Sequence, residues 1–375
     1  MKINKLLLGS AVFAGALLFS ATLYFNNTAL YSPRTNEATE DASEEAEGAA
    51  QWLFNLKKNP LTGTVDDVDI LKAREDAAKF LVDNANTNRA AIGLEWTELG
   101  PDNIGGRTRA ILIDKNNPNK VFAGSVAGGL FISTNGGSNW TKYNDQMENM
   151  VLSCITQAAN GDIYIGTGED LYNNIGGGTG PAGLLGGGIY KSTDGGTTFT
   201  LLPSTIPSVA NSVSNTGNLF IGVNNMAADP TNSNKIYAAT RFGLRMTIDG
   251  GATWTHAATL SNGNAITSRC TDVDVASDGT VIASIGNKLY ISPNGDQGTY
   301  VSTGITGLPA SVSRIEFAIA PSDPNYMYAL AGKTTGFLEG VYQSTNKGLN
   351  WTKIGNGGST QFEPFGTGQA AMVLS

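Results

Sequence analysis

A short motif occurs five times in this chain and carries an acidic or amide side chain at a fixed position. Each copy has a Ser or Thr, then an Asp or Asn two residues later, then a glycine-rich stretch that ends in an aromatic residue. Recurring carboxylates suggest general acid–base catalysis. The position holds Asp194 and Asp249 in two copies but an amide in the other three, Asn135, Asn294 and Asn346. Because an amide does not titrate as a carboxyl does, we interpret the motif as structural rather than catalytic.

Hydrogen bonding is the chemistry that Asp and Asn share, and it suits a tight turn. The side-chain oxygen accepts bonds from backbone N–H groups of its own turn, and glycine adopts positive φ at little steric cost. Runs of β-formers such as Leu130–Ile132 flank the copies, so each copy is predicted to be a β-hairpin turn. The closing aromatic residues are expected to be buried between neighbouring sheets. They are Trp140, Phe199, Trp254, Tyr300 and Trp351.

The spacing of the copies predicts the architecture. They begin at residues 133, 192, 247, 292 and 344, which are 59, 55, 45 and 52 residues apart. This period fits one four-stranded sheet with its loops, which is a propeller blade. The first repeat has strand patterns at 109–113, 121–123 and 130–132. We therefore expect an all-β β-propeller with five blades, preceded by short helices. Residues 367–375 resemble the start of a sixth blade, so the sequence is interpreted as truncated.

From about Trp96 to its end, the chain resembles the secreted bacterial Asp-box (BNR-repeat) propellers. The repeated motif and the stretch Trp96–Arg109 carry this resemblance. They are most similar to the sortilin-like or glycosyl-hydrolase-like group that is associated with type IX secretion. The resemblance implies the propeller fold and a structural role for the motif. It says little about function, because one fold hosts many functions.

Loops opposite the motif turns are the expected location of function, since ligands usually meet that face of a propeller. The largest loop begins at Glu169 and runs through a glycine-rich stretch to Gly188. A polar, aromatic-flanked rim there suits a glycan or an extended peptide. The alternative is a variable surface loop. Carboxylates in this loop are also candidates for a calcium site, because hard cations take oxygen ligands, and no other cofactor is expected. The candidate ligand-binding residues are Glu169, Asp170, Tyr172, Asn173, Arg241 and Arg107.

Two classes of glycoside hydrolase, the sialidases and the xyloglucanases, share this repeat. The Arg-Ile-Pro signature of sialidases is absent, and the arginines give no defensible triad. The xyloglucanases place an acidic residue before the Gly-Gly of strand three, where this chain has Gly124–Gly129 without a carboxylate. We therefore assign no catalytic residue and expect a non-catalytic binding propeller for a polysaccharide or protein ligand. The alternative is a xyloglucanase-like or sialidase-like glycoside hydrolase whose catalytic residues lie partly outside this chain.

The net charge and the histidine and cysteine content limit the classes of partner and cofactor that this protein is expected to bind. A net charge of −8 and the lack of a basic patch argue against nucleic acid and anionic membrane surfaces. With one histidine, zinc and haem sites are not expected. The two cysteines, Cys154 and Cys270, fall in inner strands two blades apart. We expect buried free thiols, with a bridge as the alternative.

The N-terminal region indicates export. Residues 1–25 are basic and then apolar, as in a Sec signal peptide or an uncleaved anchor. We therefore expect a secreted or cell-surface protein that meets the secretion machinery, and a membrane only if this segment stays uncleaved. Residues 26–50 are an acidic linker and 51–92 a short helical leader, with helical patterns at 49–56 and 67–82. The leader is expected to be a strap on the propeller of residues 93–375, or else a removable prosegment.

Overall fold

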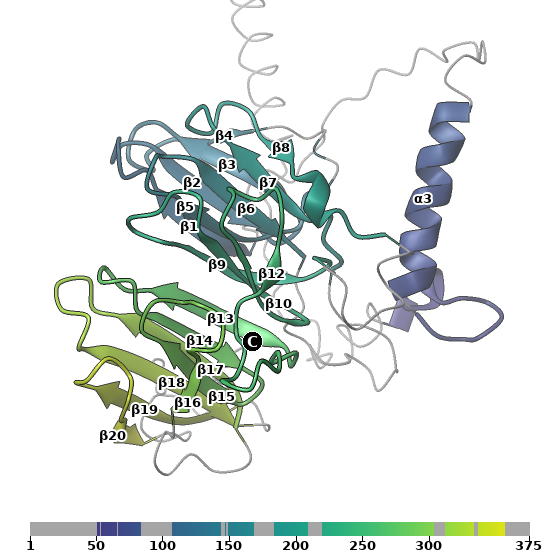
Figure 1. The fold of residues 1–375 in the computed structure, drawn as a ribbon. Coiled ribbons are helices and arrows are strands. Elements are labelled where there is room, and N and C mark those ends of the chain that lie inside the picture. Colours follow the sequence, from purple (N-terminus) through teal and green to yellow (C-terminus); the bar gives the residue numbers. More distant parts are fainter. Residues whose placement is uncertain are drawn as a thin grey trace, which may run out of the picture. The chain divides into compact units, whose positions relative to one another are not determined.

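Most of the regular structure in the described part of this protein is β-strand (Figure 1). The computed structural model describes residues 51–83, 107–168, 184–208, 220–303, 312–333 and 337–356, with short gaps at 53, 66, 144–146 and 148. The chain forms two units, Met1–Leu56 and Lys57–Ser375. All the described strands lie in the second unit. The expected signal segment, the acidic linker and the start of a sixth blade lie outside the described residues.

Five antiparallel sheets of four strands each confirm the predicted β-propeller. The first contains β1 (Thr108–Ile113), β2 (Val121–Ser125), β3 (Gly129–Ser133) and β4 (Thr141–Lys142). The second contains β5 (Leu152–Gln157), β6 (Ile163–Thr167), β7 (Ile189–Ser192) and β8 (Thr200–Leu201). The third contains β9 (Val223–Ala228), β10 (Ile236–Thr240), β11 (Gly243–Thr247) and β12 (Thr255–His256). The fourth contains β13 (Cys270–Val275), β14 (Val281–Ile285), β15 (Lys288–Ser292) and β16 (Val301–Thr303). The fifth contains β17 (Val312–Ile319), β18 (Met327–Lys333), β19 (Leu338–Ser344) and β20 (Thr352–Asn356).

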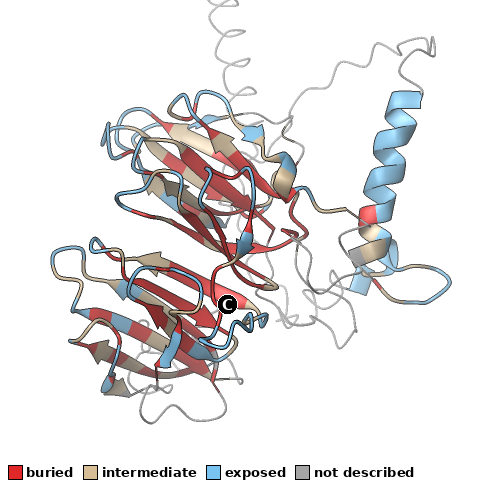
Figure 2. Ribbon diagram, viewed as in Figure 1, coloured by how far each residue is buried: buried red, intermediate tan, exposed pale blue. Residues whose placement is uncertain are grey.

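Within each sheet the strands pair in chain order, so the first strand of every blade is the inner one. The inner strands contact one another in sequence, β1 with β5, β5 with β9, β9 with β13 and β13 with β17. Figure 2 shows buried residues along these strands and exposed residues at the connecting turns. This arrangement brings the inner strands of all five described blades around one interior region.

Among the described residues, helical structure occurs only on the N-terminal side and in one short turn. Helix α3 spans Asp67–Asp83, in agreement with the helix predicted at 67–82. Residues 51–57 are also helical apart from the gap at 53, as the apolar pattern there predicted. A 3-10 turn, η2, covers Pro203–Thr205. No helix in the described ranges is long and apolar enough to cross a membrane.

The repeated motif forms the predicted hairpin turns between the third and fourth strands of each blade. In the second blade, Ser192 Oγ donates to Asp194 Oδ1 at 2.7 Å, and Thr198 N–H donates to the same oxygen at 2.9 Å. In the first blade, Asn139 N–H makes the same bond to Asn135 Oδ1 at 2.8 Å. Asp and Asn thus accept the same hydrogen bonds. The turn bonds hold the pKa of Asp194 well below its usual range, so this carboxyl stays ionised and structural.

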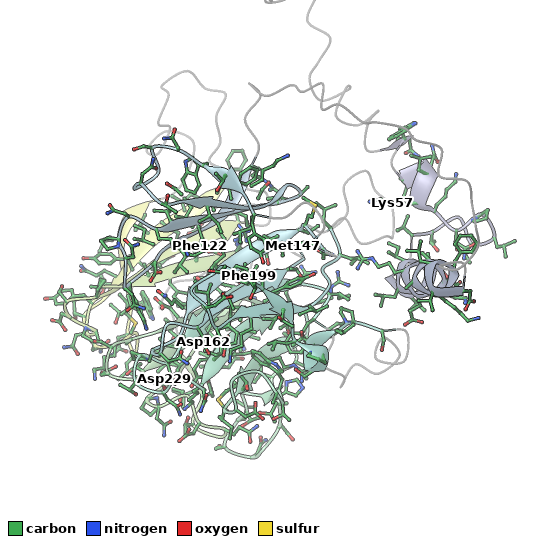
Figure 3. The ribbon with its side chains drawn as sticks, turned by 90° about the horizontal axis from the view of Figure 1, so that it is seen from above. Lys57, Phe122, Met147, Asp162, Phe199 and Asp229 are labelled. Carbon is green, nitrogen blue, oxygen red and sulfur yellow. The ribbon has the colours of Figure 1, made fainter. Side chains whose placement is uncertain are left out.

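Large side chains fill the layers between neighbouring blades. Trp254 and Phe220 meet edge to face, with ring centroids 5.3 Å apart, in a cluster that joins the second and third blades. Tyr300 lies between the third and fourth blades, and Trp351 between the fourth and fifth. Phe199 packs on the cluster between the first and second blades, whose members Phe122, Met147 and Phe199 are labelled in Figure 3. Each of these aromatic residues therefore packs toward the preceding blade.

The expectation of burial is wrong for Trp140, which is 42% exposed. Since the motif aromatic of a blade packs toward the preceding blade, Trp140 would need a sheet before the first one. None precedes it among the residues that the structure describes. The same face of the first blade exposes Ile111 and Ile113. The motif thus fixes where the aromatic residue points, whereas its burial depends on a neighbour.

Candidate functional site

The loops that connect the second and third strands lie beside the starts of the inner strands. In four blades a backbone N–H of this loop donates a hydrogen bond to the carbonyl of the residue directly before the inner strand. The bonds run from Val126 to Arg107, Gly168 to Val151, Arg241 to Gly222 and Gly286 to Arg269, at 2.7 to 3.3 Å. The backbones of the predicted ligand-binding residues Arg107 and Arg241 therefore lie at the same end of the blades.

The motif turns lie at the opposite end of the strands. There the motif backbone bonds to the turn between the first and second strands of its own blade. Gly136 donates to Asn119 at 2.9 Å, Gly250 to Asn234 at 3.0 Å, and Lys347 to Asn325 at 3.1 Å. As the sequence predicted, the motif turns and the loops between the second and third strands lie at opposite ends of the blades. The motif residues are therefore far from the loop-bearing face.

Every inner strand contains a register shift at its second residue. Such a β-bulge bends the strand and redirects a side chain. The residues at the shifts are Arg109, Ser153, Asn224, Thr271 and Ser313. Four of them, Arg109, Ser153, Asn224 and Thr271, line a common cavity of about 240 Å³. We call it the channel cavity. It is formed by the inner strands of all five described blades, and we treat it as the candidate site.

The lining of the channel cavity is mostly polar. It contains hydroxyl, amide and charged groups together with a short apolar stretch, and it consists of Arg109, Ala110, Ile111, Ser153, Cys154, Ile155, Asn224, Asn225, Thr271 and Glu316. Ligand sites usually combine a concave surface with a few convergent polar groups. The cavity has this character, and it is built on strands rather than on loops.

Two buried polar atoms in this lining have no hydrogen-bond partner within the described parts of the chain. One is Oδ1 of Asn224, a side chain that is only 3% exposed, and the other is Nε of Arg109. The amide nitrogen of Asn224 is satisfied, since it donates to the carbonyl of Cys270 at 2.8 Å. Leaving a buried acceptor or charged donor unpaired costs on the order of 1–3 kcal/mol. The two atoms therefore mark where an added hydrogen-bonding group would stabilise the protein.

Carboxyl groups near the cavity are already held by the protein. Asp272 accepts hydrogen bonds from Asn225 Nδ2 at 2.5 Å, from its neighbour Val273 N–H at 2.9 Å and from Phe317 N–H at 3.2 Å. These bonds connect the inner strands of the third, fourth and fifth blades. Burial, and then the nearby Glu316 carboxylate, raise the pKa of Asp272 to about 7. Glu316 itself is paired with Arg314, whose Nε lies 2.6 Å from Oε1.

Both cysteines are free and buried, as the sequence predicted. Cys154 lies on β5 and Cys270 on β13, two blades apart. Burial raises the pKa of Cys154 to about 12 and that of Cys270 well above its usual value. The thiols are therefore protonated at neutral pH, because burial outweighs the opposing effect of the Arg109 charge on Cys154.

The structure tests only part of the predicted rim. Glu169, Asp170, Tyr172 and Asn173, which also carried the calcium hypothesis, lie outside the described residues. Arg107 is exposed and Arg241 half-buried, and neither lines the channel cavity. The polar residues at the bulges were missed. Their signal was a polar residue at the second position of each inner strand, as in Thr-Arg-Ala-Ile and Leu-Ser-Cys-Ile.

The two ends of the long loop in the second blade pack closely against their surroundings. A Cβ at Gly168 would lie within 3 Å of backbone atoms of Ile221 and Gly186. The two ends of the loop, at Gly168 and Gly186, therefore come closer together than a residue with a side chain would allow. Helix α3 also holds this segment, because Arg74 donates to the carbonyls of Gly186 at 2.8 Å and Leu185 at 3.0 Å. Leu71 of α3 packs with Leu185 and Ile221. The helix thus contacts the second and third blades at the loop-bearing end.

Comparison with known proteins gives structural neighbours only. No protein-family model matches the sequence, and no curated protein matches it. A GH74 enzyme from Niastella koreensis is 20% identical, with a TM-score of 0.43, over 66% of this chain and 31% of that chain. An ancestral GH74 enzyme is 18% identical, with a TM-score of 0.49, over 68% and 34%. YCF48 from Cyanidioschyzon merolae is 16% identical, with a TM-score of 0.36, over 66% and 85%. This chain therefore spans about a third of the length of the two GH74 enzymes.

Proposed function

We propose that this protein is an exported, non-catalytic binding propeller that holds one sugar unit of a polysaccharide in the channel cavity. The observation that carries the proposal is the buried and unpartnered Oδ1 of Asn224 in a cavity lined by hydroxyl and amide groups. A sugar hydroxyl both donates and accepts hydrogen bonds, so it matches such a lining. Export is supported by the basic and then apolar pattern of residues 1–25.

A binding role fits the carboxyl groups better than catalysis does. Glycoside hydrolysis needs one carboxyl group to give a proton to the leaving oxygen and a second to act as base or nucleophile. Asp272 uses both of its oxygens to accept bonds that join inner strands, and Glu316 is paired with Arg314. Both groups are thus engaged in the protein. A glycoside hydrolase whose catalytic residues lie partly outside this chain remains the competing function, and a protein ligand the competing partner.

Calorimetric titration of the full chain with soluble plant and bacterial polysaccharides tests the proposal. We expect saturable binding of at least one polysaccharide and no release of reducing ends. Asn224→Leu, which removes the unpartnered carbonyl at similar volume, should weaken binding at least tenfold. Thr271→Val, which removes one lining hydroxyl, is a second variant in case the first one does not fold.

Asn139→Ala is the matched control, because this exposed side chain lies on a motif turn at the opposite end of the blades. It should bind like the natural protein. Turnover of any polysaccharide would favour the hydrolase instead. Equal binding by the natural protein and both cavity variants would exclude the channel cavity as the site.

A further inference from the structure

We infer that the channel cavity is selective for sugars that carry a carboxylate, namely uronic-acid residues, and that Arg109 is the side chain that binds this carboxylate. The inference rests on the proposed function, because it names the class of sugar for the same site. Three observations support it: the Nε of Arg109 lacks an acceptor, the nearby Glu316 is paired with Arg314, and the remaining lining contains hydroxyl and amide groups.

Arg109 is directed into the cavity by the bulge at the second residue of β1. Its Nε is buried without an acceptor, and no carboxylate in the described part of the chain forms an ion pair with it. The residue as a whole is half-buried, and a charge that is partly removed from water usually gains a partner, because its desolvation is expensive. A guanidinium left in this state at a cavity wall is preorganised for an anion that arrives with the ligand.

The negative groups around the cavity do not compensate Arg109. Glu316, the acidic residue in the lining, is neutralised by Arg314 at 2.6 Å. Asp272 directs its oxygens to the N–H groups of Asn225, Val273 and Phe317. Neither carboxyl group is therefore ion-paired with Arg109 among the described residues.

The rest of the lining distinguishes an acidic sugar from other anions. One guanidinium offers a planar pair of donors that matches a single carboxylate, whereas phosphate groups usually recruit several cations. Ser153, Asn224 and Thr271 provide the hydroxyl and amide groups that ring hydroxyls require. A peptide C-terminus would need an apolar pocket for its last side chain, and apolar groups are the minority of this lining. A uronic acid combines the carboxylate with the hydroxyls.

The experiment compares oligouronates with their methyl esters, which keep every hydroxyl and lose only the charge. Oligogalacturonate, oligoglucuronate and oligomannuronate are titrated into the full chain at low and at high salt. We expect at least one free acid to bind ten or more times tighter than its ester, with affinity that falls as salt rises. Arg109→Gln should lower the affinity for the acid at least tenfold and leave the affinity for the ester unchanged.

Lys288→Gln is the matched control, since Lys288 is a cation that is exposed and does not line the cavity. It should bind the acid like the natural protein. Equal binding of acids and esters, or an unchanged Arg109→Gln variant, would overturn the inference while the proposed function stands. Binding of neither form, with binding of a peptide that has a free C-terminus, would overturn the inference and the proposed function together.

Discussion

The carboxyl group of Asp272 gives a quantitative test of how the inner strands are held together. It is only 4% exposed and accepts bonds that join the third, fourth and fifth blades. Its pKa rises from 3.8 to about 7, chiefly because of burial. A raised pKa in the folded state means that folding favours the protonated form. The stabilisation is therefore complete below about pH 4 and is lost as the pH rises toward 7.

The size of this effect follows from the change in pKa. Roughly three units separate the folded from the unfolded carboxyl, and each unit corresponds to about 1.4 kcal/mol, so the limit is about 4 kcal/mol. Asp272→Asn removes the titration. The free energy of unfolding of the natural protein minus that of the variant should thus decrease by about 3 kcal/mol between pH 4.5 and 7.5, since the full limit is reached only below both pKa values.

Urea unfolding followed by tryptophan fluorescence measures this difference. A comparison of two proteins is needed because burial lowers the pKa of His256 to about 4. This makes the natural protein lose stability as the pH falls below 6.5, which opposes the effect of Asp272. The contribution of His256 cancels in the difference. Asp194→Asn is the control, since that motif position already holds Asn in three copies and its titration lies below the measured range. A difference that stays constant with pH would refute the reasoning.

Two further predictions concern the layers between the blades. Trp351→Ala, which empties a buried site between the fourth and fifth blades, should lower the free energy of unfolding by about 3–5 kcal/mol. Trp140→Ala should cost less than about 1.5 kcal/mol, because this ring is 42% exposed; similar losses in urea unfolding would show that the packing assignment is wrong. The thiol of Cys270, which does not line the channel cavity, should react with a disulfide reagent at pH 8 only after unfolding, since it is buried and protonated. Fast labelling of this thiol in the folded protein would contradict its burial.

The repeated motif explains why so much of the fold was predictable. Ser192, Asp194 and Thr198 bond to one another within one turn, so their type and spacing suffice to specify it. The period of the motif then gives the four-stranded blade, and the five described sheets follow it. Local hydrogen bonds and the alternation of side chains along a strand are properties that a sequence carries directly.

The candidate site, by contrast, depends on contacts between distant parts of the chain. Arg109 and Asn224 meet in one cavity only because inner strands of different blades converge, and because a bulge in each strand redirects one side chain. Neither register nor convergence can be read from a single strand. The burial of the motif aromatic residues has the same origin, as the difference between Trp140 and Trp351 shows. The sequence by itself determined the blades and their turns, whereas the tertiary structure decided which polar groups face the same space.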